Sequence, residues 1–303
     1  MTTSSANDIQ APTMFPECGT CLTGLARMAA ELVAGEDSDL RTRAERAARD
    51  ALDREACSGL TSPEVANRML RAMARVTGVA DPFEVYKRKE MALASTAVRS
   101  LGIDGTPDLS ALLRLAVLGN SLDFFRPPPE AFAELERFYR GGLRFHRDDS
   151  ARLAETLATR PELVIYLTDN AGEVLFDLPL YDHIRARAQR TVLGVKGGPA
   201  LNDLTRADLE QAGLAGRFAE IVDTGTDGAG LDWSRLSDEF TALLDRADLV
   251  VSKGMANFET LYPRPLPGPV FFVFKVKCRP IQDWLKAPAE SYWALWRDGR
   301  PVR

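Results

Sequence analysis

Acidic and amide side chains follow two apolar runs in the second half of the chain. Asp169 and Asn170 come directly after the run 163–167, and Asp203 comes shortly after the run 191–195. Carboxylate and amide oxygens are hard ligands that suit Mg²⁺, Mn²⁺ and similar cations. The chain has only two histidines, so a metal bound here would need oxygen ligands.

A lysine and a glycine follow another apolar run. Lys253 and Gly254 end the run 249–252 and precede a helical pattern that includes Asn257. A lysine beside the backbone N–H groups of a helix N-terminus suits a phosphate. A metal site next to such a phosphate cradle indicates phosphoryl chemistry. Glu173 is either a first-turn acid favoured by the helix dipole or a functional residue.

Short apolar runs alternate with amphipathic helical patterns in this half of the chain. We expect strands at 163–167, 191–195, 220–222, 249–252 and 270–276, with helical patterns at 174–187, 206–212, 234–247 and 257–261. This alternation predicts a doubly wound, mainly parallel, Rossmann-like α/β sheet with helices on both faces. The carboxyl ends of parallel strands meet at one edge, so the polar residues above should collect there.

The first half of the chain shows helical patterns only. We therefore predict a disordered N-terminus at 1–13, a helical domain at 14–155 and an α/β domain at 156–303 that binds metal and phosphate. Asp108 is expected to cap a helix at 109–118, and Asn120 follows shortly after it.

Composition narrows the class of protein. The 303 residues are 45% hydrophobic and 27% charged, with a net charge of −5 and no concentrated basic run, which argues against a nucleic-acid partner. No apolar run approaches the ~20 residues that span a bilayer, and no secretory signal is visible, so we expect a cytoplasmic protein without a membrane partner. Four cysteines make no disulfide framework; Cys18 and Cys21 are either reduced structural thiols or a metal or redox pair.

Several motifs together resemble one known family. "TDNAGEVLFD", "VKGGPALNDLT", "SKGMANFETL" and "FKVKC", with "AVLGNSLDFF" in the helical half, are similar to segments of the damage-control phosphatases. These are metal-dependent phosphatases that were long catalogued as a domain of unknown function. The resemblance covers roughly residues 14–285, and "CGTCL" resembles the CxxC-bearing microbial branch.

The resemblance implies a function and a set of site residues. It implies hydrolysis of small phosphate monoesters, such as sugar phosphates and related phosphometabolites, with a divalent cation (Mg, Mn, Co or Ni) as cofactor. Asp169, Asn170 and Asp203 would hold the metal and serve catalysis. The residues expected to bind the substrate and its phosphate are Lys253, Gly254, Asn257, Asn120, Asp123 and Glu173.

Other interpretations remain open. The attacking group could be a water activated by the metal or Asp169 itself, through a phospho-aspartate. One alternative is an S-adenosylmethionine-dependent carboxyl methyltransferase, although Gly172 is the only glycine in the turn after the first strand. Another is a non-catalytic phosphometabolite-binding protein, supported by the unusual Met255-Ala256 pair after Gly254.

Overall fold

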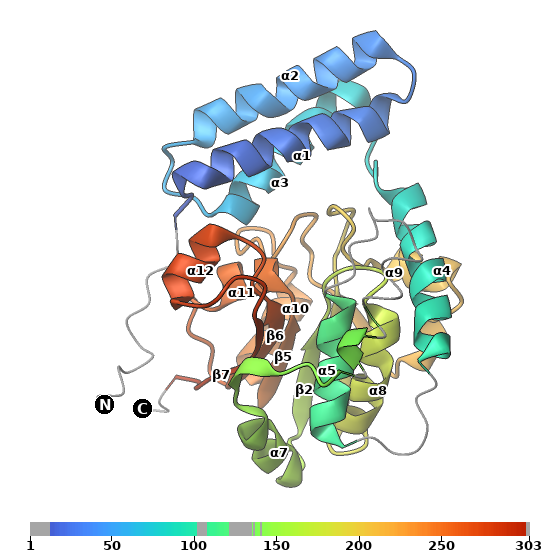
Figure 1. The fold of residues 1–303 in the computed structure, drawn as a ribbon, viewed down its shortest axis with the longest axis vertical. Helices are drawn as coiled ribbons and strands as arrows, with labels where there is room; N and C mark the ends of the chain where they lie inside the picture. Colours follow the sequence, from blue (N-terminus) through green and yellow to red (C-terminus); the bar gives the residue numbers. More distant parts are fainter. Residues whose placement is uncertain (1–12, 102–107, 121–134, 136, 140, 301–303) are drawn as a thin grey trace.

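A seven-stranded sheet forms the centre of the molecule (Figure 1). The computed structural model describes residues 13–101, 108–120, 135, 137–139 and 141–300. The strands are β1 (Phe145–Asp148), β2 (Leu163–Leu167), β3 (Arg190–Val195), β4 (Ile221–Asp223), β5 (Leu249–Lys253), β6 (Val270–Lys275) and β7 (Tyr292–Arg297), in the order β1-β7-β6-β5-β2-β3-β4.

The strand directions create a switch point between β2 and β5. Strands β6, β5, β2, β3 and β4 are parallel to one another, whereas β7 runs antiparallel to β6. From β2 the chain moves to β3 and β4 on one side, and then returns to β5 on the other. Ligands of open α/β sheets bind at the carboxyl ends of strands where the order reverses in this way. The ends of β2 and β5 are therefore the place to look for a site.

Helices cover both faces of the sheet (Figure 1). One hydrophobic cluster joins the sheet to α4 (Glu84–Ser100), α5 (Leu109–Gly119), α7 (Ser150–Ala158), α8 (Val174–Arg185) and α9 (Arg206–Gln211). A second cluster, on the opposite face, joins it to α10 (Asp238–Arg246), α11 (Met255–Leu261) and α12 (Arg279–Leu285). The alternation of side chains along each strand explains the division, because Leu249 and Val251 belong to the first cluster and Val250 to the second.

Three N-terminal helices form a separate cluster. Helices α1 (Pro16–Ala34), α2 (Ser38–Glu55) and α3 (Ser62–Thr77) pack through a seam of buried alanines, and lie together at one end of the molecule (Figure 1). Asp37 caps α2 and Thr61 caps α3, the latter in a capping box with Glu64. The predicted limits of the helical domain, 14–155, stay a prediction. Helices α4, α5 and α7, which fall largely within those limits, share their hydrophobic core with the sheet.

The predicted fold class is confirmed, and each predicted strand is present within two residues of its expected ends. Strands β1 and β7 and helices α7 and α12 were missed. β1 is only four residues long with mostly exposed side chains, and β7 lies outside the strand–helix alternation that guided the prediction. The disordered segment predicted at 1–13, apart from Thr13, lies outside the described residues. None of the described helices is both long and apolar enough to cross a membrane.

Candidate active site

Asp169, Asn170 and Asp203 come together at the carboxyl ends of β2 and β3. Asn170 and Asp203 form an isolated antiparallel bridge. On either side of it, Leu204 N donates to Asp169 O at 2.8 Å and Ala171 N donates to Asn202 O at 2.8 Å. The loop after β3 therefore folds back onto the turn after β2 through its backbone. This pairing brings the three predicted metal ligands into one cluster.

Asn120 reaches this cluster from the end of α5. Its Nδ2 donates to Asp169 Oδ2 at 2.9 Å and to Glu173 Oε1 at 2.7 Å, and its Oδ1 accepts from Lys275 N at 3.3 Å. Asn170 Nδ2 also donates to Glu173 Oε1, at 2.8 Å. The structure thus places Asn120 and Glu173 in direct contact with the predicted metal ligands. Asp123, the other residue predicted from the same segment, lies outside the described residues.

The side chain of Lys253 turns into the protein under the cluster. It is fully buried, and its Nζ donates to Asp177 Oδ1 at 2.5 Å, to Ala116 O at 2.9 Å and to Glu173 Oε2 at 3.3 Å. Burial acts to lower the pKa of Lys253, but Asp177 and Glu173 outweigh it and leave the pKa raised. For Asp177, burial raises the pKa to about 6, although the positive charge of Lys253 opposes this rise. The predicted phosphate contact of Lys253 stays a prediction, and these acids are its partners in the structure.

A second buried lysine lies beside Asp203. Lys196 Nζ lies 3.3 Å from Asp203 Oδ2 and donates to Asn257 Oδ1 at 3.4 Å and to Gly230 O. Asn257 in turn donates through Nδ2 to Thr168 O at 2.8 Å and to Lys253 O at 2.9 Å. Asn257, predicted to bind substrate, therefore connects the ends of β2, β3 and β5.

Gly254 lets the Asp169 carboxylate approach the start of α11. Its φ of 83° and ψ of 161° lie in a region that is essentially restricted to glycine. A Cβ at this position would lie 1.9 Å from Asp169 Oδ2. The glycine is therefore required by both its backbone conformation and its neighbour.

Negative charge exceeds positive charge inside this edge of the sheet. The buried acids there are Glu90, Asp169, Glu173, Asp177 and Asp203, and the buried ammonium groups are those of Lys196 and Lys253. Burial raises the pKa of Asp169 well above its usual range, and Glu173 and Asp203 raise it further. Burial likewise raises the pKa of Asp203 and of Glu90. Such a cluster is costly unless a cation offsets the charge.

The donor set fits a divalent cation with oxygen ligands. Asp203 Oδ2 is buried, and its ion-pair partner is the ammonium group of Lys196 at 3.3 Å. The amide nitrogen of Asn170 is used by Glu173, which leaves its oxygen as the donor toward a metal. No three His, Cys, Asp or Glu side chains of the described ranges are arranged to hold a metal ion. The predicted ligand set consists of two carboxylates and one amide oxygen. Oxygen ligands of this kind suit a hard cation.

Sequence reasoning missed three members of the cluster. Lys196 directly follows β3, and Lys253 is the last residue of β5, so the strand-end position of Lys196 was an available signal. The period of β5 puts Lys253 on the face of Leu249 and Val251, which predicts an inward-pointing ammonium and an acid such as Asp177 to receive it. Glu90 lies in the first, helical part of the sequence and had no comparable signal.

Cysteines line a cavity bordered by α1, α11 and α12. Cys18, Cys21 and Cys278 line one cavity of about 220 Å³ together with Glu259, and all four cysteines of the chain are free thiols. Burial raises the pKa of Cys278 to about 11, so the side chain is a thiol and not a thiolate at neutral pH. The reduced-thiol interpretation of Cys18 and Cys21 stays a prediction.

The fold and the cluster define a class: α/β proteins whose oxygen donors and lysines meet at a switch point of the sheet. The comparisons identify the family within that class. Residues 14–291 match the damage-control phosphatase ARMT1-like domain, and the chain belongs to this family. The resemblance predicted from the motifs is confirmed.

Individual relatives support the same assignment over most of their length. A damage-control phosphatase of Pyrococcus horikoshii is 32% identical over 275 residues, covering 90% of this chain and 94% of the relative. A damage-control phosphatase of Archaeoglobus fulgidus is 30% identical, with 88% and 93% covered. The crystal structure of a DUF89 family protein from P. horikoshii aligns with a TM-score of 0.85 and 29% identity, covering 94% of this chain and 99% of that one. The family and these relatives support a phosphatase role.

Proposed function

We propose that the protein is a metal-dependent phosphatase that hydrolyses small phosphate monoesters. One observation carries the proposal: Asp169, Asn170 and Asp203 come together at the carboxyl ends of β2 and β3, among buried acids that outnumber the buried lysines. Damage-control phosphatases are generally metal-dependent, which supports the same conclusion. The substrate class, a sugar phosphate or related phosphometabolite, remains part of the proposal.

Each residue of the cluster has a distinct role in this proposal. Asp169, Asn170 and Asp203 would hold a divalent cation (Mg, Mn, Co or Ni), which supplies Lewis-acid stabilisation of the phosphoryl charge. Asn120 and Glu173 fix the orientation of Asp169 and Asn170 through the hydrogen bonds described above. Preorganised donors of this kind need little rearrangement during the reaction.

The start of α11 would receive the phosphate. Gly254 carries no side chain at the start of α11, where backbone N–H groups and the helix dipole favour an anion. Lys253 adds positive charge below it, shared with Glu173 and Asp177. Whether a water molecule or Asp169 attacks phosphorus is left open, because both routes use a carboxylate beside the metal.

The test is phosphate release from p-nitrophenyl phosphate after removal of metal by a chelator and addition of Mg²⁺, Mn²⁺, Co²⁺ or Ni²⁺. Asp203→Asn should lower kcat by at least ~100-fold and weaken Mn²⁺ binding in calorimetry, because it removes a charged oxygen donor. Full activity of this variant would refute the assignment of Asp203.

A matched control lies on α8. Asp182 is solvent-exposed and pairs with Arg185 and Arg217. Asp182→Asn removes one carboxylate charge from the same protein, so it should retain both Mn²⁺ binding and activity. An equal loss in both variants would indicate a general charge effect and contradict the proposed site.

The two alternative functions make different predictions. A methyltransferase would need an acid after the second strand for the ribose of S-adenosylmethionine, and Lys196 occupies that position. A binding protein would hold a sugar phosphate without releasing phosphate under any metal condition. A screen of phosphometabolites, with S-adenosylmethionine binding measured in parallel, separates the three functions.

A further inference from the structure

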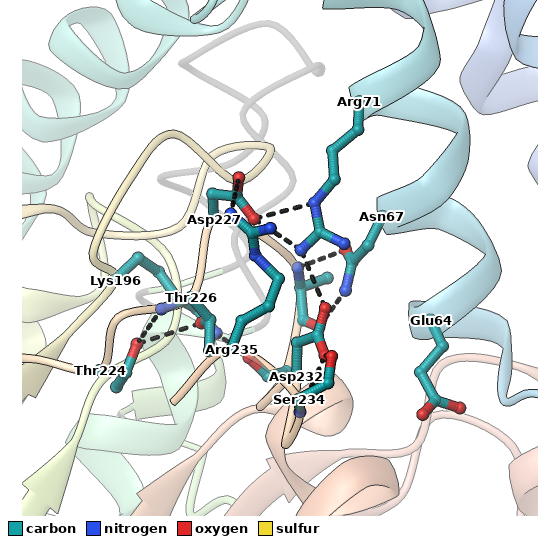
Figure 2. A network of polar contacts seen from close by, with 12 residues as sticks. Glu64, Asn67, Arg71, Lys196, Thr224, Thr226, Asp227, Asp232, Ser234 and Arg235 are labelled. Carbon is teal, nitrogen blue, oxygen red and sulfur yellow. Dashed lines mark hydrogen bonds and ion pairs between the residues drawn. The ribbon is translucent and has the colours of Figure 1, made fainter. Parts of the chain in front are cut away.

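Side chains of helix α3 bind the loop that follows β4. Arg71 donates through Nε to Asp227 Oδ1 at 2.9 Å, and through Nη2 to the same oxygen at 2.5 Å and to Asp232 Oδ2 at 2.9 Å (Figure 2). Arg235 holds the other oxygen of Asp227 at 3.0 Å. The guanidinium therefore ties two acids of one loop to a helix that is more than 150 residues away in the sequence.

Asn67, one turn before Arg71 on α3, makes a second set of hydrogen bonds to this loop. It is buried, its Nδ2 donates to Ala229 O at 3.1 Å, and its Oδ1 accepts from Ala229 N at 2.7 Å. A Cβ on Gly228 would lie 2.3 Å from Asn67 Cγ, so the loop approaches α3 as closely as a glycine allows. We call Asn67, Arg71 and their partners in 227–232 the α3 latch.

The same loop holds the Lys196 side of the candidate active site. Thr226 O accepts from Gly197 N at 2.8 Å and from Gly198 N at 3.3 Å. Gly230 O accepts from Lys196 Nζ. An ammonium group has three donors, and the remaining partners of Lys196 are Asp203 and Asn257. The loop therefore supplies one of the contacts that aim Lys196 at Asp203.

We propose that Asn67 and Arg71 are positioning residues, which set Lys196 and, through it, Asp203 by fixing the loop 224–232. The proposal rests on the proposed function in assigning Asp203 to the site. Neither residue contacts the site itself. Their effect passes through two carbonyl groups of one loop, those of Thr226 and Gly230.

The first test is a double-mutant cycle on kcat/KM for p-nitrophenyl phosphate. Arg71→Gln should lower kcat/KM on the order of tenfold, because small displacements of a site are costly. In a Lys196→Met background the same substitution should change kcat/KM by a smaller factor, since the contact through Gly230 O is absent and only that through Thr226 O remains. Equal effects of Arg71→Gln in both backgrounds would overturn the proposal, as would an unchanged kcat/KM in Arg71→Gln alone.

Arg190 provides the matched control. It makes a two-pronged ion pair with Glu220, with Nε to Oε2 at 2.9 Å and Nη2 to Oε1 at 2.6 Å, at the opposite end of the parallel strands. Arg190→Gln removes a comparable ion pair without touching the latch, so it should leave kcat/KM within about twofold of the wild type. Arg71→Lys, which keeps the charge but loses the fork of donors, should recover only part of the activity.

Hydrogen exchange tests the latch without any activity measurement. In Arg71→Gln, amide exchange should become at least several-fold faster in the peptide 196–203 as well as in 224–232. Faster exchange confined to 224–232 would overturn the coupling to Lys196. If the wild type releases no phosphate, the proposed function fails, while this measurement still decides whether the latch holds the 196–203 segment.

Discussion

The Glu259 side chain shows how one buried group can set a pH dependence. It is 8% exposed and lines the cavity with Cys18, Cys21 and Cys278. Burial raises its pKa to about 8. Below about pH 4.5 both the folded and the unfolded chain bind this proton, and between about 4.5 and 8 only the folded chain does. The stability contributed by the group therefore falls as the pH rises through this window.

Glu259→Gln is expected to remove that dependence. The variant should be more stable than the wild type at pH 8, on the order of 3 kcal/mol, with the difference shrinking as the pH falls toward 5. Chemical denaturation at several pH values measures it. Glu31→Gln, at an exposed position of α1, is the control and should show no such trend. A constant difference between Glu259→Gln and the wild type at all pH values would contradict the raised pKa.

At the scale of an element, the β5–α11 turn determines the geometry of the site. Gly254→Ala would place a Cβ against Asp169 and force a glycine-only conformation, so we expect a stability loss of ~1–3 kcal/mol from the backbone and displacement of Asp169 in addition. Thermal denaturation and phosphatase assays measure the two effects separately.

Gly213→Ala is the control that separates backbone strain from the displacement of Asp169. Gly213 also has a positive φ, of 68°, but a Cβ there would meet nothing within 4 Å. It should lose stability while keeping its activity, whereas Gly254→Ala should lose both. Retained activity in Gly254→Ala would show that Asp169 tolerates displacement, and would count against its role as a metal ligand.

The sequence predicts such elements better than it predicts the directions of long side chains. Apolar runs with polar residues at their ends predicted five of the strands and most of the polar residues at the carboxyl edge of the sheet, because burial and strand termination act locally. The ion pair between Lys253 and Asp177 joins residues from separate elements. The alternation of β5 predicts that Lys253 points inward, whereas only the packing of α8 against the sheet identifies Asp177 as its partner. Glu90 illustrates the limit, since only the docking of α4 brings it to Asn202.

At the scale of the whole molecule, the distribution of cores favours a division of the chain near residue 80. Helices α1 to α3 have their own cluster, which ends at Phe83, whereas Met91 on α4 already belongs to the cluster of the sheet. We propose that α1–α3 form one cooperative unit and that α4, α5 and α7 unfold with the sheet. The division predicted from the helical patterns, with a helical domain at 14–155, makes the opposite prediction for α4, α5 and α7.

A substitution that overpacks α2 distinguishes between these two divisions of the chain. Ala48 is fully buried in the alanine seam, so Ala48→Leu should force the three helices apart and destabilise them by ~1–3 kcal/mol. Hydrogen exchange should then become faster in α1–α3, while α4, α5 and α7 keep the protection of β2 and β5. Arg43→Leu, which adds a leucine to the exposed side of the same helix, should leave exchange unchanged. If α4, α5 and α7 lose protection together with α1–α3, the helical part unfolds as one unit and the 14–155 division is the correct one.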